Sequence, residues 1–125
     1  MQHVLIDACG WVACIDAKIN IQSDMEALLG PCTWVLLPSV EGELQRLATQ
    51  RPRAKPLLLN LLNSRALHYG DEKSQHADDA IFACAASNDW VTLTVDTELK
   101  RRLYEANLRV LEVRQNNHLH LVDSL

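Results

Sequence analysis

Six acidic side chains in this sequence fall where a folded chain could gather them around a metal ion. Two of them directly follow apolar runs, and the other four lie in segments with a helical pattern. Several carboxylates in one crevice repel one another, so they must take up protons or bind a cation. Oxygen ligands without His or Cys suit Mg²⁺ or Mn²⁺ better than zinc. The six are Asp7, Glu41, Glu43, Asp78, Asp79 and Asp96.

Such a site points to hydrolysis of a phosphodiester. A hard divalent ion can activate water and stabilise the charge that develops on a phosphodiester during its cleavage. The chemistry requires carboxylates contributed by separate elements of the fold, so the surrounding sequence must supply strands and helices that converge.

The surrounding segments predict alternating strands and helices. Strands are expected at 4–6, 33–37, 91–94 and 109–113, with a weak edge strand at 66–69. Helices are expected at 23–29, from the cap Ser39 onward, and at 57–62, 77–88 and 97–106. Connections of this length imply β-α-β units in a mainly parallel sheet flanked by helices. The tail from 114 to 125 is expected to be irregular.

The ends of two strands predict where the site lies. In open α/β sheets, ligands bind beyond the carboxyl ends of the strands. Asp7 follows the first strand and Asp96 follows the strand that begins at Val91. Both carboxylates should therefore face the same crevice.

Helical position distinguishes one acidic pair but not the other. At about 100° per residue, Asp78 lies roughly 60° from the centre of its helix's apolar face and Asp79 roughly 160° from it. Asp78 is therefore the better candidate for a half-buried ligand. Glu41 and Glu43 both flank the apolar stripe of their helix, and geometry does not choose between them.

Each acid also has an ordinary structural explanation. Asp96 precedes a helix and could be its N-cap. Asp78 and Asp79 lie in a first turn, where acids complement the helix dipole. Glu43 could be a surface residue, whereas Asp7 closes an apolar strand and needs a partner or a ligand. The set is more informative than any one member.

Length and composition favour one globular domain. The chain has 125 residues, of which 48% are hydrophobic and 22% charged, enough for a single core over residues 1–125. No apolar run approaches the roughly 20 residues of a membrane helix. The N-terminus does not resemble a signal peptide, so a cytoplasmic location is expected. The four cysteines lack C-x-x-C spacing and are expected to be reduced core residues.

The formal net charge of −4 combines the acidic residues with two basic runs. Each run fits a solvated helix face, but together they would also fit a basic rim that holds a phosphate backbone. The runs are Arg46, Arg51, Arg53 and Lys55, followed by Lys100, Arg101 and Arg102.

With these residues placed, the sequence resembles the PIN-domain family over nearly all of its length. The shared motifs are V-L-I-D-A-C ending the first strand, E-L-Q-R-L from Glu43, D-D-A-I from Asp78 and T-V-D from Thr94. The likeness is closest to the ribosome-processing PIN nucleases and their prokaryotic relatives. These share A-D-D from Ala77 and the more specific run T-V-D-x-[DE]-L-K-R-R, which ends at Arg102.

The resemblance implies a metal-dependent ribonuclease that leaves a 5′-phosphate and a 3′-hydroxyl. It implies that Mg²⁺ or Mn²⁺ is held by Asp7, Glu43, Asp78 and Asp96, with Glu98 supporting through water. It also makes Arg46, Lys100, Arg101 and Arg102 candidates for contacting the RNA backbone, which positions the substrate without reading its sequence.

One departure from the family pattern leaves a second function open. The family commonly has Thr or Ser and then Asn or Ser after the first Asp, whereas this chain has Ala8 and Cys9. Since a thiol is a weak hydrogen-bonding group, the alternative is a catalytically inactive PIN-like module that binds RNA or protein. A phospho-receiver domain is disfavoured because no adjacent acidic pair follows the first strand.

The resemblance also implies partners. Similar domains often form homodimers, and the apolar segment 57–62 is either an interface or part of the core. Some family members are toxins with a protein antitoxin, and others mature RNA. The sequence does not choose between these roles.

Overall fold

The computed structural model describes residues 1–70, 76–114 and 117–123. Strands and helices alternate along most of the chain, as the sequence predicts. The strands are β1 (Gln2–Ile6), β2 (Cys32–Leu36), β3 (Leu67–His68), β4 (Val91–Leu93), β5 (Val110–Val113) and β6 (Leu119–Val122). The helices are α1 (Ala8–Asp16), α2 (Ile21–Leu29), α3 (Pro38–Thr49), α4 (Leu59–Arg65), α5 (Ala77–Asn88) and α6 (Thr97–Glu105).

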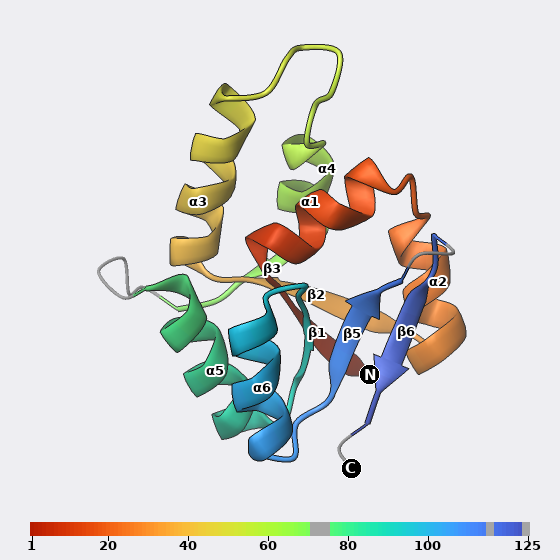
Figure 1. Cartoon of the computed structure of the whole chain (residues 1–125), viewed down its shortest axis with the longest axis vertical. Coiled ribbons are helices and arrows are strands. Elements are labelled where there is room, and N and C mark those ends of the chain that lie inside the picture. Colours follow the sequence, from red (N-terminus) through yellow and green to blue (C-terminus); the bar gives the residue numbers. More distant parts are fainter. Residues whose placement is uncertain (71–75, 115–116, 124–125) are drawn as a thin grey trace.

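The six described strands form one sheet in the order β3-β2-β1-β4-β5-β6. All neighbouring pairs are parallel except β5 and β6. The chain moves from β1 outward to β3, then returns through α5 to β4 on the other side of β1 (Figure 1). The strand order reverses between β1 and β4, and such a switch point is where open α/β sheets bind ligands.

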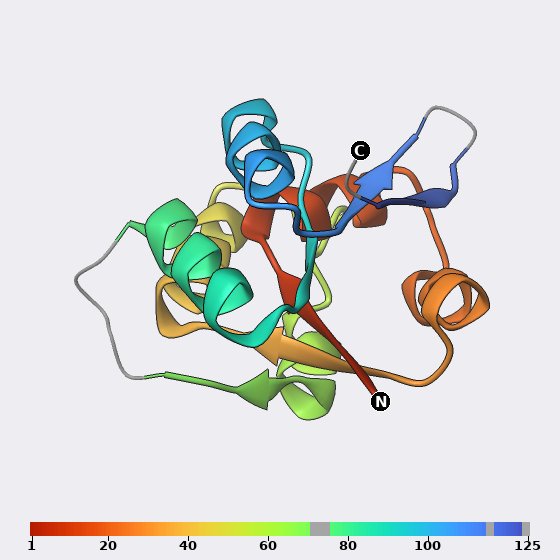
Figure 2. The same cartoon turned by 90° about the horizontal axis from the view of Figure 1, so that it is seen from below.

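Helices cover both faces of the sheet. Figure 2 shows α5 and α6 together on one face and α2 on the opposite face. Helices α1, α3 and α4 form the upper part of the molecule in Figure 1. This confirms the expected α/β architecture with a mainly parallel, helix-flanked sheet.

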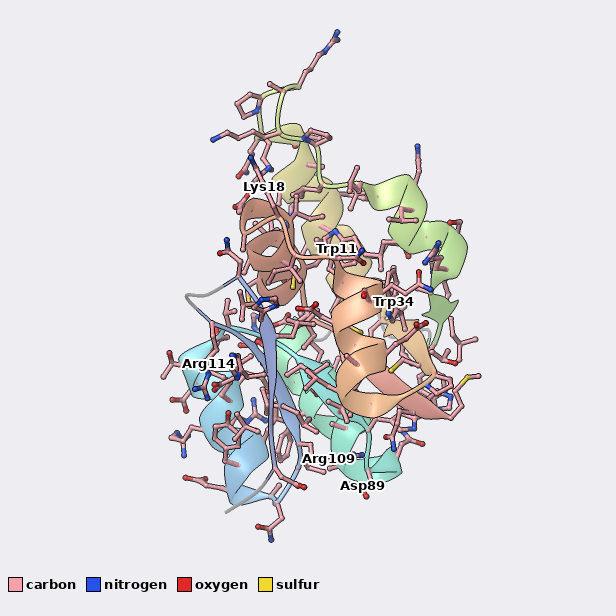
Figure 3. All side chains as sticks on the ribbon, turned by 90° about the vertical axis from the view of Figure 1, so that its right-hand side faces the viewer. Trp11, Lys18, Trp34, Asp89, Arg109 and Arg114 are labelled. Atoms are coloured by element: carbon pink, nitrogen blue, oxygen red, sulfur yellow. The ribbon has the colours of Figure 1, made fainter. Side chains whose placement is uncertain are left out.

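The core beneath α1 is built around two tryptophans. Trp11 is fully buried, and its ring meets that of Trp34 edge to face at a centroid distance of 5.6 Å (Figure 3). The indole Nε1 of Trp11 donates to the carbonyl oxygen of Leu57 at 2.7 Å. Since a buried indole N–H needs a partner, this bond ties α1 to the segment that precedes α4.

Helix α1 is an element that the sequence analysis did not predict. It begins directly after Asp7, whose carboxylate Oδ1 accepts the backbone N–H of Ala8 at 2.9 Å. Its buried side includes Gly10, which packs against the backbone of β4 at Leu93 and Thr94. The helix therefore positions the acid that closes β1.

The predicted starts of three helices are wrong. Helix α2 begins two residues earlier than expected, capped by Asn20, whose Oδ1 accepts the N–H of Ser23 at 3.1 Å. Helix α3 begins at Pro38, because proline suits the first helical turn and needs no N–H partner there. Helix α4 begins only after Leu58, which has a left-handed backbone (φ 52°).

The tail is not irregular throughout, since β6 pairs antiparallel with β5 from Leu119 to Val122. Its apolar residues alternate with His120, and Leu119 is buried. The alternation is the period of a strand with one covered face, and the pairing adds a sixth strand to the sheet.

The described residues contain no helix long and apolar enough to cross a membrane. The four cysteines are reduced, as expected. Cys14 and Cys84 are buried in agreement with a core role, whereas Cys9 and Cys32 are half-buried. The segment 57–62, expected to be an interface or part of the core, contains both buried and exposed leucines. Leu57 and Leu62 are buried, whereas Leu58 and Leu61 are 47% and 40% exposed.

Candidate metal centre

Asp7 is the buried centre of the acidic cluster, with only 3% of its surface exposed. The end of β1 is held to the neighbouring strand, since the N–H of Asp7 donates to the carbonyl of Leu93 at 3.1 Å. Its Oδ2 accepts the hydroxyl of Thr94 at 2.7 Å and the thiol of Cys9 at 3.1 Å. These donors fix the orientation of the carboxylate.

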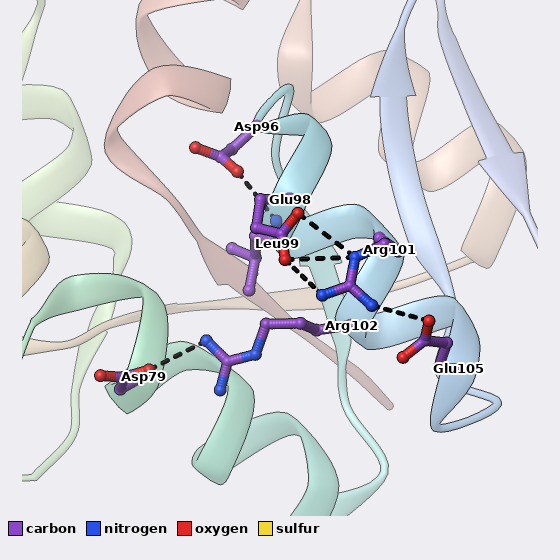
Figure 4. A network of polar contacts seen from close by, with 7 residues as sticks. All are labelled: Asp79, Asp96, Glu98, Leu99, Arg101, Arg102 and Glu105. Atoms are coloured by element: carbon purple, nitrogen blue, oxygen red, sulfur yellow. Dashed lines mark hydrogen bonds and ion pairs between the residues drawn. The ribbon is translucent and has the colours of Figure 1, made fainter.

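Thr94 connects the two acids at the strand ends. Its hydroxyl donates to Asp7, and its Oγ1 accepts the backbone N–H of Asp96 at 3.1 Å. Asp96 also caps α6, since its Oδ1 accepts the N–H of Leu99 at 2.8 Å (Figure 4). The capping alternative is therefore confirmed, and the charge of the same residue acts on Glu43 and Asp78.

Glu43 and Asp78 complete the cluster from two helices. Burial raises the pKa of the half-buried Glu43 carboxyl, and the charges of Asp7, Asp78 and Asp96 raise it further. Burial likewise raises the pKa of Asp78, together with the charges of Asp7 and Asp96. Carboxylates from β1, α3, α5 and the end of β4 thus act on one another.

In each of the two acidic pairs, Asp78 with Asp79 and Glu41 with Glu43, the two side chains have different surroundings. Asp78 is half-buried, whereas Asp79 is exposed and pairs with the guanidinium of Arg102 at 2.9 Å. This agrees with the burial predicted from helical position. Glu41 approaches the imidazole of His68 at 3.4 Å, while Glu43 takes part in the acidic cluster.

Cys9 occupies the place where the family commonly has a hydroxyl or an amide. Its thiol also lies 3.4 Å from Oγ1 of Thr94. Burial, and then the charge of Asp7, raises the pKa of Cys9 to about 11. The thiol is therefore protonated at neutral pH and donates to Asp7, the contact that a polar side chain would make there.

Glu98, Lys100 and Arg101 are engaged outside this cluster. Arg101 pairs with Glu98 and, at 2.7 Å, with Glu105 on the outer surface of α6 (Figure 4). Lys100 lies 3.2 Å from Glu112 of β5. A supporting role of Glu98 toward a metal ion stays a prediction.

Two arginines do line the cleft beside the acids. The cleft has a volume of about 980 Å³ and is formed by α3, the start of α5 and one residue of α6. Arg46 comes from α3, and Arg102 from α6. The guanidinium of Arg102 also lies 4.6 Å from the ring centre of Phe82, and together with Asp79 this ring fixes its position.

The donor set fits a hard divalent cation. Within residues 1–70, 76–114 and 117–123, no group of three His, Cys, Asp or Glu side chains is arranged to hold an ion as it stands. The oxygen donors are nevertheless those that Mg²⁺ and Mn²⁺ prefer. The pKa values of Glu43 and Asp78 are raised first by burial and then by the charges of neighbouring acids, a repulsion that a cation would relieve.

Sequence reasoning named Cys9 only as a departure from the family pattern and assigned no role to Thr94. Thr94 was part of a quoted motif, but its bond to Asp7 depends on the parallel pairing of β1 with β4. A buried polar residue two positions before an acid, at the end of an apolar strand, is the signal that could have identified it.

Without a cation, this cluster should make the stability of the protein depend on pH. Because folding raises the pKa of Glu43, the folded state holds more protons than the unfolded state between the ordinary and the raised pKa. The free energy of unfolding therefore falls as pH rises through that window and stays lower above it. In EDTA, Glu43→Gln should raise the Tm at neutral pH, and its advantage should shrink as pH falls into the ordinary carboxyl range.

Thermal unfolding across this pH range tests the prediction. Glu26→Gln is the matched control, because Glu26 is exposed on α2. A Tm gain of Glu43→Gln that is the same at every pH, or a loss, would contradict it.

Comparison with known proteins gives matches of three kinds. A family model described as a PIN-like domain matches residues 4–116, a range that contains Asp7, Glu43, Asp78 and Asp96. Ribonuclease VapC4 of Methanocaldococcus jannaschii is 34% identical over 110 residues, covering 83% of this chain and 84% of that protein. The solved structure of the PIN domain endonuclease Utp24 matches with a TM-score of 0.79 and 21% identity, covering 98% of this chain and 95% of the other. At that identity, the structural match shows the fold alone.

Proposed function

Because this chain belongs to the PIN-like domain family, we propose that it is a metal-dependent endoribonuclease. The observation that carries the proposal is that four carboxylates from separate elements, one of them the buried Asp7, act on one another. The 34% identity to a protein named a ribonuclease supports RNA as the substrate.

Mg²⁺ or Mn²⁺ would be held by Asp7, Glu43, Asp78 and Asp96, with Glu98 in a supporting position. A bound ion would supply activation of water and stabilisation of charge on the phosphodiester. Thr94 and Cys9 hold Oδ2 of Asp7. Among the described residues, its Oδ1 accepts only the N–H of Ala8 and retains a lone pair for a cation. The protein's part is to present these oxygens in a fixed arrangement.

The phosphate backbone would lie in the cleft between α3 and α5. Arg46 and Arg102 line this cleft and carry the charge that a phosphate needs. The first turns of α3 and α5 also line it, and helix N-termini favour anions. Lys100 and Arg101 are not among the residues that line the cleft, and they pair with glutamates elsewhere, so they would contribute less to binding than these two.

The proposal covers both a toxin with a protein antitoxin and an RNA-maturation enzyme, since RNA is the substrate of either. A homodimer stays a prediction, and the exposed Leu58 and Leu61 of the α4 region offer apolar surface for it.

Cleavage of a structured and an unstructured RNA by the purified chain tests the proposal. We expect cutting with Mn²⁺ or Mg²⁺ and none in EDTA, with a 5′-phosphate on the product. If the protein binds RNA but does not cut it with either ion, the alternative of a non-catalytic binding module replaces the proposal.

Metal binding should also stabilise the fold. A ligand of the folded state adds about 2.7 kcal/mol when its concentration is about 100 times its Kd. The Tm is therefore expected to rise with Mn²⁺ concentration, and Glu43→Gln should reduce this rise. A Tm that does not respond to Mn²⁺ or Mg²⁺ would count against the metal site.

A further inference from the structure

The segment from the second half of α3 to β3, which contains the loop between α3 and α4, is basic although the chain as a whole is acidic. Residues 44–70 contain no acid and five cations, whereas the rest of the chain has seven cations against sixteen acids. The five are Arg46, Arg51, Arg53, Lys55 and Arg65. The loop projects at the top of the molecule in Figure 1, and Figure 3 shows the same projection from the side.

The two basic runs of the sequence differ in how their charges are used. In the α6 run, each of Lys100, Arg101 and Arg102 pairs with an acid. Within the described residues, Arg53 and Lys55 have no such acidic partner, and both are exposed. Of the charges in these two runs, those without an acidic partner among the described residues therefore lie mainly in the loop between α3 and α4.

Arg51 holds the loop between α3 and α4 in a defined shape. Arg51 pairs with Asp16 of α1 at 2.6 Å and donates from Nε to the carbonyl of Lys55 at 2.9 Å. The N–H of Lys55 donates back to the carbonyl of Pro52 at 2.9 Å. Arg51 thus serves the fold, and the loop that it closes presents Arg53 and Lys55 to solvent.

The far end of the loop is anchored as well. The bond from Trp11 to the carbonyl of Leu57 ties the loop to α1. Two prolines, Pro52 and Pro56, restrict the backbone between these anchors. A loop shaped in this way loses less conformational entropy when it binds an extended partner than a free chain would.

Helix α3 connects the loop to the cleft. Glu43 belongs to the acidic cluster, and Arg46, on the next turn, lines the cleft. From Glu43 to Thr49 at the end of α3 the rise is on the order of 9 Å, at about 1.5 Å per residue. A polyanion cut at the carboxylates would pass Arg46 and reach the loop within a few nucleotides.

We propose that Arg53 and Lys55 form a second contact for the RNA backbone, outside the catalytic cleft, and that the substrate extends along α3. This inference rests on the proposed function. Contacts of this kind hold phosphates without reading bases, so they add affinity for longer RNA and leave the sequence preference unchanged.

The test compares Arg53→Ala and the double variant Arg53→Ala/Lys55→Ala with Arg65→Ala. Arg65 is an exposed arginine at the opposite end of α4, so its removal changes the net charge by the same amount as Arg53→Ala. Binding of a fluorescent unstructured RNA is measured over a range of salt concentrations in an Asp7→Asn background with Mg²⁺. The double variant should bind about tenfold more weakly, and its slope of log affinity against log salt should fall by about 1.4, at about 0.7 per phosphate contact.

Cleavage kinetics of the chain with Asp7 intact provide the second measurement. For long RNA the double variant should raise KM with little change in kcat, while an RNA too short to reach the loop should be cut as by the wild type. If the loop variants match the wild type in binding and KM while the wild type cuts RNA, the inference fails and the proposed function stands. That would also be the result if the loop served an acidic protein instead. If the wild type neither binds nor cuts RNA, both fail.

Discussion

Asp7→Asn is expected to abolish metal-dependent RNA cleavage, lowering kcat/KM by at least about 10³-fold, or about 4 kcal/mol of transition-state stabilisation. Asp7 is the most buried acid of the cluster, and its charge acts on both Glu43 and Asp78. Asparagine has the same shape but removes the charge that attracts a cation. Rates measured on one RNA with Mn²⁺ test this.

The same substitution should leave the fold intact. The asparagine carbonyl can accept the N–H of Ala8, and its amide can donate to the hydroxyl of Thr94. Loss of one like charge removes repulsion in the absence of metal, so the Tm in EDTA should be unchanged or higher. Unfolding of the variant would show instead that the carboxylate is needed for structure.

Asp89→Asn provides a control with the same chemical change. Asp89, labelled in Figure 3, is exposed just after the end of α5, whereas Asp78 lies in the first turn of the same helix. Its variant should cut RNA at the wild-type rate. Activity retained by Asp7→Asn, or lost equally in both variants, would contradict the assigned role of Asp7.

Gly10→Ala is expected to destabilise the protein by about 3 kcal/mol, the upper range for overpacking. An added Cβ would lie 2.5 Å from the carbonyl oxygen of Leu93 and 3.0 Å from Cα of Thr94. Both are backbone atoms of the sheet, which cannot move aside as a flexible side chain could. Helix α1 would have to shift, and the bond between Asp7 and Thr94 would lengthen with it.

The sign of the stability change on Gly10→Ala shows whether α1 packs closely on β4. In an open helix, replacing glycine by alanine stabilises by about 0.5–1 kcal/mol. Gly42 of α3 meets that condition, because an added Cβ there would have no atom within 4 Å. Urea denaturation of the two variants should therefore give opposite shifts. Equal stabilisation by both would mean that α1 does not pack closely on β4.

Several features of the fold and site could be predicted because they depend on neighbours in sequence. The period of the apolar residues predicted α5 with its observed bounds, and the burial of Asp78 relative to Asp79. The apolar runs before Asp7 and Asp96 predicted that both acids end parallel strands. The four quoted motifs predicted the family, which the comparisons confirm.

Helix α1 could not be predicted because local preference and tertiary packing conflict there. Gly10 disfavours a helix when taken alone, and nothing in the segment indicates that the backbone of β4 lies against it. The glycine is required by that contact, which forms only when residues far apart in sequence meet.

The ion pairs of the basic residues also differ in whether the sequence could predict them. The pairing of Arg101 with Glu98 and Glu105 follows helical spacing and could be inferred from sequence. The pairing of Arg102 with Asp79, of Lys100 with Glu112 and of Arg51 with Asp16 joins separate elements. The sequence alone therefore determined which charges the chain carries and which periods its elements follow. The tertiary structure decided which charges neutralise one another and which remain free for a ligand, because an ion pair depends on distance in space.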